Sequence, residues 1–578
     1  MNYHQKIFML LIMLTCVGIQ AADLSVRWNN NQLQTSYNIR RSCGYRGSMG
    51  QTPTNIDNLN PDQATVPNYA GLFSKGLQHD LVSGNLTASG QANWLQLFHA
   101  VETGAQADFN AVQRAGVLTF VDPQGGLMFA LQGNDSSLMV ALPTFSITSA
   151  WGAVNLLEIY WMSLARDVLF SAYGTGTGSD ANGLGGSITN DAAAVMQSFG
   201  STYLGPKGPG GVVNASLVFR GDFPGALVGP YISQFLYLTQ LRWHLTPLTQ
   251  TIPTAPPQNY DVSWNQFISL QNGIVLTPAA PFGALRYISS GRDLAHAVHN
   301  DCLYESYYTA AFILADYGFP YSPTFPYNNG SMPNEAPFVS LGKPDVFAAL
   351  GAVSSEALKA AWANKWRGYR VLRPEEFGGL VQQAKITATN PYNIDPSMFA
   401  LHAGIDTLGR VLSYNSTQSV YYPSENVATY LLSQAYPEGC PLHPSYTSGH
   451  ATVGGACVTV IKAFFDDLAL ISTHTTPVIP NPANLATLIP LADGTQNLLT
   501  VGGELDKLAT NVAAGRNWSG IHYRADADYG NLLGEQVAIA WLQDQAQLYN
   551  EQLFTGFQLT TFNGQRINIT ASAVTVIG

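Results

Sequence analysis

The sequence is poor in charge, and what charge it has is mostly negative. Only 11% of its 578 residues are charged, whereas about a quarter is usual for a soluble chain. With 46% apolar residues, the composition is that of a globular protein and excludes disorder, collagen and a coiled coil. Lysine and arginine number 26 against 37 acidic residues, a formal net charge of -11. This balance argues against a nucleic-acid partner.

Long apolar runs are also missing after the N-terminus. Lys6, the apolar run 7–19 and Gln20-Ala21-Ala22 are typical of a secretory signal peptide. We therefore exclude residues 1–21 from the fold and expect export to the periplasm or the medium. No later stretch reaches the roughly 18 to 20 apolar residues that a membrane span needs, so no membrane span is expected.

Cysteine is scarce, which leaves the core to carry the stability. Beyond the signal segment the chain has Cys43, Cys302, Cys440 and Cys457. They are an even set in a compartment that permits disulfides. Three pairings are possible, and the sequence does not choose among them.

Helical periodicity dominates the part of the chain that follows. Apolar residues recur at three- and four-residue intervals over 149–171, 292–317, 345–367, 451–470 and 531–549. The first hundred or so mature residues have weak periodicity and predict an irregular, loop-rich segment. Alternation over 557–569 around Asn563-Gly564 predicts a β-hairpin. We expect a mostly α-helical protein with an N-terminal half over 22–290 and a C-terminal half over 291–578, packed as one unit.

Three short segments of the C-terminal half hold most of its polar groups. The first is Lys365-Trp-Arg-Gly-Tyr-Arg-Val-Leu-Arg373-Pro374, which alone is explained by helix capping. The second is His443-Pro-Ser-Tyr-Thr-Ser448-Gly449-His450, a loop that opens onto an apolar helix. The third is Arg516-Asn-Trp-Ser-Gly-Ile-His522-Tyr-Arg-Ala-Asp526.

Together these residues suit a tetrahedral or trigonal-bipyramidal oxoanion. Two arginines and a lysine supply charge and directed donors. Ser448 and the Gly449 N–H, at a helix N-terminus, add neutral donors. A nitrogen of His522 is suited to bond the central atom, with Asp526 fixing its tautomer. A further histidine is then available as an acid or base.

The three segments resemble those of the superfamily that unites vanadium-dependent haloperoxidases with type 2 phosphatidic-acid-phosphatase-like acid phosphatases. Its pattern is K…RP, PSGH and SR…H…D, and here Thr447 stands in place of Pro and Gly515 in place of Ser. The Lys-to-Arg spacing of eight and the string HPSYxSGHAT look like the algal and cyanobacterial bromoperoxidases. Segments such as VDPQGGLMFALQGNDS, LLEIYWMSLARDVLF, FRGDFPGALVGPYISQF and SGRDLAHAVHND resemble them too, so the likeness covers most of the mature chain.

The resemblance implies a vanadate cofactor and a role for each site residue. Vanadium would be held by His522, and the vanadate oxygens by Lys365, Arg373, Ser448, the Gly449 N–H and Arg516. His450 would bond the apical oxygen and take protons from hydrogen peroxide, Lys365 would assist catalysis, and His443 would tune the peroxide-bound state and the halide side. Trp362, one helical turn before Lys365, would together with His443 set halide selectivity.

The resemblance also implies an architecture and a reaction. We expect two four-helix bundles, with the vanadate site at one end of the second. The reaction is oxidation of bromide and iodide, and weakly of chloride, by hydrogen peroxide to hypohalous acid, which halogenates small organic acceptors. The alternative is an acid phosphatase with His522 as nucleophile. An exported structural protein with a vestigial anion site is disfavoured because the whole set of residues is present. A homo-oligomer is expected.

Two further features are weaker metal-site candidates. His296 and His299 have helical spacing but lack the HExxH pattern of zinc proteases, so we interpret them as structural. The Asn134 turn and the 325–335 loop carry oxygen ligands, and red-algal relatives bind calcium in the latter region. The sequence FPYNNGSMPNE has no evident calcium-ligand pattern, so calcium is possible without motif support.

Overall fold

The computed structural model describes residues 30–51, 56–174, 188–239, 249–278, 280–328 and 330–577. The chain divides into two units, residues 1–52 and 53–578, which are treated separately. In its described part the first unit holds helix α2 (Asn30–Gly44) and a π-helical turn over Tyr45–Met49. The predicted signal peptide lies outside the described residues.

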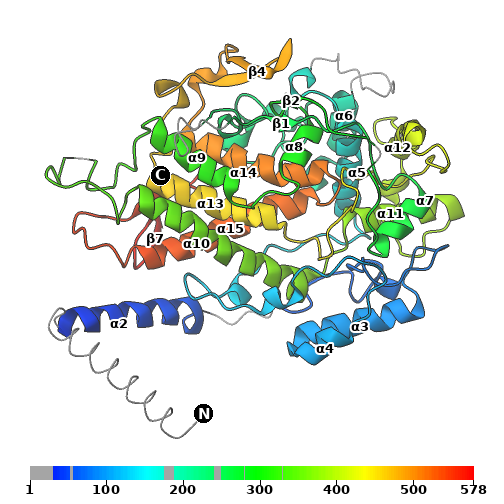
Figure 1. The fold of residues 1–578 in the computed structure, drawn as a ribbon, viewed down its shortest axis with the longest axis horizontal. Coiled ribbons are helices and arrows are strands. Elements are labelled where there is room, and N and C mark those ends of the chain that lie inside the picture. The colour runs from blue at the N-terminus through cyan, green and yellow to red at the C-terminus, as the bar shows by residue number, and fades with distance from the viewer. Residues whose placement is uncertain are drawn as a thin grey trace, which may run out of the picture. The chain divides into compact units, whose positions relative to one another are not determined.

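The second unit is built on a bundle of four long helices. These are α10 (Lys343–Trp362), α13 (Gly449–Phe464), α14 (Val501–Trp518) and α15 (Arg524–Gln545), which pack against one another (Figure 1). Three of them match the predicted periodic segments, although α15 begins before residue 531. The fourth, α14, was not predicted. Its buried face carries the ion pair Lys507–Glu504, and buried charges of this kind hide the apolar period.

Helices α13 and α15 touch backbone to backbone because glycines face the contact. A Cβ on Gly455 would lie 2.0 Å from the Asn531 carbonyl oxygen, and a Cβ on Gly534 would lie 2.0 Å from the Thr452 carbonyl oxygen. Any larger residue at either position would push the helices apart. The contact places the first residues of α13 beside the first turn of α15.

A second group of helices surrounds the buried helix α5 (Ala150–Ala165). Its neighbours are α6 (Ile188–Ser198), α11 (Pro374–Thr387) and α12 (Thr407–Ser416), and α5 also contacts α14 and α15. The two helix groups therefore share one core. The mostly α-helical fold is confirmed.

The prediction of one continuous helix over 292–317 is wrong. The structure has α8 (Gly291–Ala297) and α9 (Glu305–Asp316) with a turn between them. The intervening residues include Asn300 and Asp301, side chains that favour turns over helix interiors. This turn carries a residue of the site.

The remaining described elements are short helices and small antiparallel sheets. The helices α3 (Ala88–Thr103) and α4 (Gln106–Ala111) make the first hundred or so mature residues less irregular than predicted, since Thr87 caps a regular α3. A further helix, α7 (Trp264–Gln271), lies later in the chain. The sheets pair β1 (Ile252–Pro253) with β2 (Leu285–Arg286), and β3 (Val478–Asn481) with β4 (Asn484–Pro490). No helix among the described residues is long and apolar enough to cross a membrane.

The Asn563-Gly564 hairpin is confirmed and extended. Strand β5 (Phe557–Thr560) pairs with β6 (Arg566–Ile569) in the register Phe557 to Ile569. Gly564 turns the chain with a φ of 78°, a backbone conformation that glycine adopts at little cost. A third strand, β7 (Val574–Val576), pairs with β6, so the C-terminal ribbon is a three-stranded sheet.

Candidate active site

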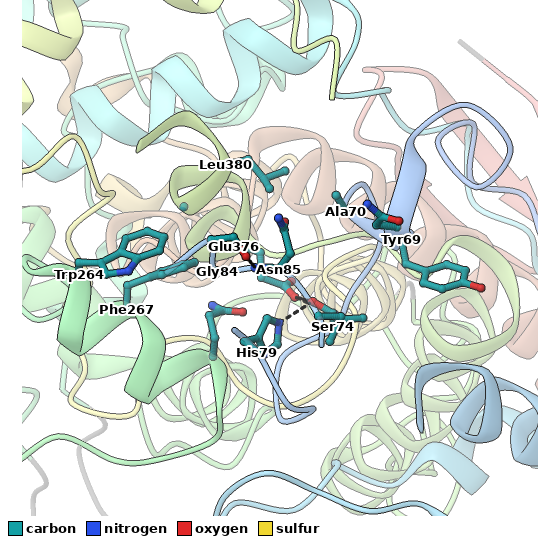
Figure 2. Close-up of a pocket in the computed structure, with 15 residues that line it drawn as sticks. Tyr69, Ala70, Ser74, His79, Gly84, Asn85, Trp264, Phe267, Glu376 and Leu380 are labelled. Carbon is teal, nitrogen blue, oxygen red and sulfur yellow. Dashed lines mark hydrogen bonds between the residues drawn. The ribbon is translucent and has the colours of Figure 1, made fainter. Parts of the chain in front are cut away.

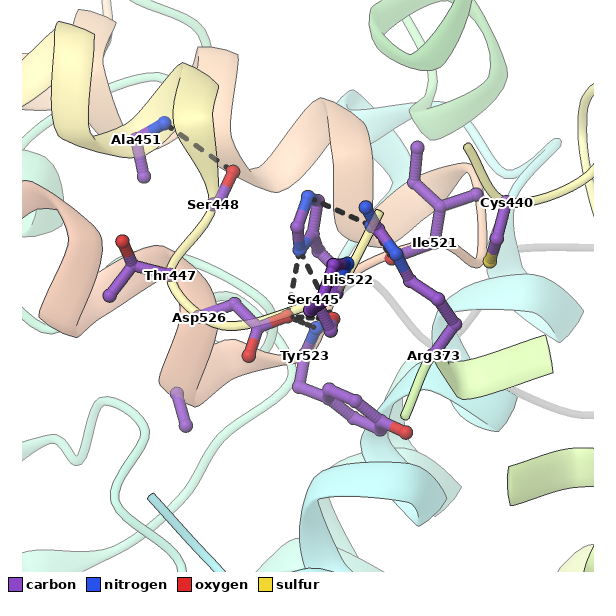
Figure 3. A network of polar contacts seen from close by, with 12 residues as sticks. Arg373, Cys440, Ser445, Thr447, Ser448, Ala451, Ile521, His522, Tyr523 and Asp526 are labelled. Carbon is purple, nitrogen blue, oxygen red and sulfur yellow. Dashed lines mark hydrogen bonds and ion pairs between the residues drawn. The ribbon is translucent and has the colours of Figure 1, made fainter. Parts of the chain in front are cut away.

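The three polar segments meet at one end of the four-helix bundle, as expected. Figure 3 shows the meeting of the N-cap of α11, the loop before α13 and the start of α15. Lys365, Arg373 and Ser448 have no solvent exposure, and His522 has 2%. The predicted residues therefore form one buried cluster.

Lys365 lies in a π-helical turn (Ala363–Tyr369) that follows α10. Its Nζ donates to the carbonyl oxygens of Pro444 at 2.9 Å and Ser445 at 2.7 Å. Burial, and then the charge of Arg373, hold the pKa of Lys365 well below its usual range. A negative ligand beside this ammonium would favour its charged form.

Arg373 connects all three segments through its guanidinium. Nε donates to the His443 carbonyl at 2.9 Å, and Nη1 donates to the Ile521 carbonyl at 2.8 Å. Nη1 also lies 3.1 Å from Nε2 of His522, and Nη2 lies 2.9 Å from Nδ1 of His443. Because arginine only donates hydrogen bonds, Nε2 of His522 presents its lone pair to Arg373.

The backbone of Arg373 is held by a carboxylate that sequence reasoning did not single out. Oε2 of Glu376 accepts from the Arg373 N–H at 2.6 Å, while Oε1 accepts from the N–H of Ser74 at 2.7 Å. Glu376, Ser74 and His79 line a small pocket beside Trp264 (Figure 2). Glu376 thus connects the N-terminal part of the second unit to Arg373, the N-cap of α11.

His522 is oriented by Asp526, which lies one helical turn further on. Nδ1 of His522 donates to Oδ2 of Asp526 at 2.7 Å, so Nε2 carries the lone pair. Burial, followed by the charges of Arg373, Lys365 and Arg516, holds the pKa of His522 well below its usual range. Burial raises the pKa of Asp526 to about 6. A neutral imidazole therefore points its free nitrogen into the cluster.

The N-terminus of α13 supplies neutral donors and an acid–base pair. Ser448 is the N-cap, and its Oγ accepts from the Ala451 N–H at 3.4 Å. Gly449 opens the helix, where backbone N–H groups lack partners within the helix. His450 pairs through Nε2 with Oδ1 of Asp301 at 2.7 Å.

Asp301 is a site residue that the sequence reasoning missed. Burial and the charge of Arg516 lower the pKa of His450, while the hydrogen bond to Asp301 raises it. Asp301 ends the segment SGRDLAHAVHND, whose likeness to bromoperoxidases was noted as a whole. The signal was therefore present in the sequence, but nothing in the spacing linked Asp301 to His450.

Arg516, on α14, completes the set of cations. Its Nη1 donates to the Val298 carbonyl at 2.6 Å, and its guanidinium carbon lies 5.6 Å from the Tyr436 ring centroid. Its Nε is buried and has no hydrogen-bond partner among the described residues. Gly515 stands where the family pattern has Ser because a Cβ there would lie 2.6 Å from Val298 Cγ2.

Trp362 and His443 lie together beside this cage. Their ring centroids are 5.1 Å apart, and Nε1 of Trp362 donates to the Val121 carbonyl at 3.3 Å. The Lys365 ammonium lies 5.8 Å from the Trp362 ring centroid. Burial, and then the charges of Arg373 and Lys365, hold the pKa of His443 well below its usual range. The two residues predicted to set halide selectivity are therefore in contact with each other beside Lys365 and Arg373.

The cage is suited to an oxoanion such as vanadate. Lys365, Arg373 and Arg516 are buried, and within the described chain none forms a salt bridge of 4.0 Å or less with a carboxylate. Buried charges are costly unless paired, and Asp526 alone cannot balance three. The unpartnered Nε of Arg516 and the lone pair of His522 supply a directed donor and a metal ligand.

His296 and His299, the weaker metal-site candidates, make contacts with neighbouring side chains of the fold. Nε2 of His299 lies 2.5 Å from Oε1 of Glu438, and its ring stacks on Tyr436 at 3.6 Å. Burial lowers the pKa of His296 to about 3. No group of three or more metal-ligating side chains of His, Cys, Asp or Glu occurs in the described ranges.

Three of the cysteines form no disulfide in the structure. Cys302, Cys440 and Cys457 are free thiols, with Cys302 exposed and the other two buried. None of the three possible pairings is therefore present within the residues that the structure describes. Stability rests on the shared helical core, as the scarcity of cysteine suggested.

Comparison with known proteins agrees with this geometry. Residues 412–551 match the family domain described as the VCPO second helical-bundle domain. The vanadium-dependent bromoperoxidase of Corallina pilulifera is 30% identical over 576 residues, which cover 89% of this chain and 93% of that protein. The vanadium-dependent bromoperoxidase of Ascophyllum nodosum is 33% identical over 464 residues, 78% of this chain and 77% of that protein.

A solved structure extends the likeness to the whole fold. The homohexameric second vanadate-dependent bromoperoxidase of Ascophyllum nodosum superposes with a TM-score of 0.82 at 26% identity, covering 95% of this chain and 92% of that one. The resemblance seen in the three motifs therefore holds over nearly the full length. The chain belongs to the family of vanadium-dependent haloperoxidases.

Proposed function

We propose that this enzyme oxidises halide with hydrogen peroxide and releases hypohalous acid, which halogenates organic acceptors. The observation that carries the proposal is the buried cage of Lys365, Arg373 and Arg516 around the unprotonated Nε2 of a neutral His522. The bromoperoxidase relatives, similar over most of their length, support the same reaction. Vanadate, when bound, would supply a Lewis acid that activates peroxide toward halide.

Each residue of the chain has a task in this reaction. His522 would hold vanadium through Nε2, and Asp526 keeps the proton on the other ring nitrogen. Lys365, Arg373 and Arg516 would bind the anion's oxygens, together with Ser448 and the Gly449 N–H. These donors are fixed before the anion arrives, so they stabilise developing negative charge without reorganisation.

His450 is the acid–base group of the proposal. It is paired with Asp301, and neither side chain exceeds 10% exposure. A neutral histidine beside the cage can accept a proton from hydrogen peroxide, and Asp301 stabilises the imidazolium that results. His443, whose ring lies within hydrogen-bond distance of Nη2 of Arg373, would influence the halide side.

Halide preference follows from the wall formed by Trp362 and His443. An indole makes a dry wall, and its one N–H is already donated to the Val121 carbonyl; the dryness of this wall is the feature that would favour chloride. Bromide and iodide are easier to oxidise. We infer that bromide and iodide are good substrates and that chloride is a weak one.

An acid phosphatase with His522 as nucleophile is the competing function, because the same cage would bind phosphate. The test is bromination of a dye by protein freed of metal by chelation and dialysed against phosphate, with and without added vanadate. Hydrolysis of p-nitrophenyl phosphate is measured in parallel. We expect bromination only with vanadate, competitive suppression by phosphate, and slow phosphate-ester hydrolysis.

A matched pair of variants sharpens this test. Arg516→Ala removes a cage cation, whereas Arg410→Ala removes an arginine that pairs with Asp191 outside the cage. Vanadate-dependent bromination should be lost only in the first. Full bromination without vanadium in the native protein would refute the cofactor, and fast ester hydrolysis without bromination would favour the phosphatase.

Two further properties belong to the proposal. The hexameric relative supports a homo-oligomer, which light scattering of the purified protein measures. Export is inferred from the N-terminal sequence, and the N-terminus of the mature protein, determined on secreted material, would begin near residue 22 if it is correct.

A further inference from the structure

Ser445, to which no role in the reaction has been assigned so far, contacts both Lys365 and Asp526. Its carbonyl oxygen accepts from Nζ of Lys365 at 2.7 Å, and its N–H donates to the Val371 carbonyl at 2.9 Å. Its hydroxyl donates to Oδ2 of Asp526. The residue has no solvent exposure, and Figure 3 shows its side chain between His522 and Asp526.

Among the described residues, the three hydrogen bonds to the side chain of Asp526 all fall on one oxygen. Oδ2 accepts from the Ser445 hydroxyl, from Nδ1 of His522 at 2.7 Å and from the Tyr523 N–H at 3.2 Å. Oδ1 is buried and has no partner among the described residues. The orientation of the carboxylate is therefore fixed through Oδ2. Two side chains hold this oxygen, and Ser445 is one of them.

The hydroxyl also constrains the proton on His522. Its oxygen lies 3.4 Å from Nδ1 of His522, and its one proton is directed to Asp526. Nδ1 thus faces only accepting oxygens, so it carries the ring proton. Nε2 then keeps its lone pair, which is the atom that a metal uses.

We propose that Ser445 is a positioning residue for the anion site: its hydroxyl holds Asp526 so that His522 presents an unprotonated Nε2 toward the bound vanadate. The inference rests on the proposed vanadate function. Removing the hydroxyl leaves the carboxylate held only by Nδ1 of His522 and the Tyr523 N–H, so the carboxylate and the imidazole that it orients are less firmly fixed. Partners of metal-ligating histidines typically change metal affinity by about 10- to 100-fold when they are removed.

The test compares vanadate binding by the metal-free forms of native protein, Ser445→Ala and Ser445→Thr. The dissociation constant is measured by equilibrium dialysis, and the bound anion is followed by its vanadium-51 resonance. Ser163→Ala is the matched control, because Ser163 is a buried serine on α5 whose hydroxyl donates to the Tyr160 carbonyl at 2.7 Å. Thermal unfolding of each metal-free protein shows whether it folds.

We expect Ser445→Ala to bind vanadate about tenfold more weakly with a shifted resonance, Ser445→Thr to recover most of the affinity, and Ser163→Ala to match the native protein. Ser445→Ala with native affinity and resonance would overturn the inference while leaving the proposed function intact. Native protein that binds no vanadate would overturn both.

A double variant tests the route of the effect. In Asp526→Ala protein, the additional Ser445→Ala change should cost no further affinity, because the hydroxyl acts through Asp526. Losses that simply add would show that Ser445 acts by another path, such as its carbonyl contact to Lys365, and would also overturn the inference. If Ser445→Ala does not fold, Ser445→Cys replaces it, with the same expected loss because a thiol is a weak donor.

Discussion

Replacing Asp301 by Asn should move the pH profile of bromination without abolishing it. Nε2 of His450 lies 2.7 Å from Oδ1 of Asp301, and the two side chains are 10% and 4% exposed. The change keeps an oxygen acceptor and removes the negative charge. A hydrogen bond to a charged group contributes about 1.5–3 kcal/mol, and one pKa unit corresponds to about 1.4 kcal/mol. The pKa of His450 should therefore fall by about one to two units.

The sign of the shift follows from the role of His450. The histidine must be unprotonated to accept a proton, so activity is lost as the pH falls through its pKa. Asp301 raises that pKa, and without its charge the acidic limb of kcat/KM should move to lower pH by about one to two units. The assay is dye bromination from about pH 4 to 8 at saturating vanadate and constant ionic strength.

Glu305→Gln is the matched control, because Glu305 follows in the same turn and accepts from the Cys302 N–H at 3.2 Å. Its acidic limb should coincide with that of the native protein. An unchanged limb in Asp301→Asn, at full vanadate loading, would refute the role of His450 as the titrating base.

Three other outcomes are expected. His522→Ala should lose vanadate binding as well as bromination, and normal binding by this variant would disprove the metal ligand. Trp362→Arg adds a fourth cation to the three of the cage and a hydrated group to the dry wall, so the chloride-to-bromide rate ratio should drop about tenfold, or about 1.4 kcal/mol; equal ratios at matched vanadate loading would remove Trp362 from halide selection. Burial raises the pKa of Asp528 to about 6, above its unfolded value, so the folded state favours the protonated carboxyl. This contribution to stability is lost as the pH rises from about 4 to 6. The native protein should lose unfolding free energy between pH 4.5 and pH 7.5, and in Asp528→Asn this loss should be smaller by about 2 kcal/mol. Denaturant unfolding curves at both pH values measure the loss, and an equal loss in the two proteins would contradict this.

The site residues could be predicted where the chemistry fixes their spacing within one segment. Arg516, His522 and Asp526 lie on two helix ends joined by one turn, so their order along the chain already implies their proximity. His450 and Asp301 are 149 residues apart, and no local pattern joins them. Glu376 was equally hidden, because its partners Ser74 and Lys75 come from the distant N-terminal part of the second unit.

The fold was predictable where one apolar face repeats and not where charges are buried. Helix α10 and helix α13 match their periodic segments closely. Helix α14 places Lys507 and Glu504 in the core as a pair, which breaks the apolar period although the pair is satisfied in three dimensions. The turn between α8 and α9 was hidden for a different reason, since apolar residues continue on both sides of Asp301.

The glycine contact between α13 and α15 has a consequence for how the cofactor is loaded. Helix α13 starts with the donors Ser448 and Gly449, and helix α15 starts one residue after Tyr523, which follows His522. With no side chains between their backbones, the two helices have no room to slide or to be spread by repacking. The entropy of arranging the donors is therefore lost when the chain folds and not when the anion binds, so affinity is not reduced by an ordering step. Hydrogen exchange of the amides in these two helices should accordingly be nearly the same before and after vanadate is added.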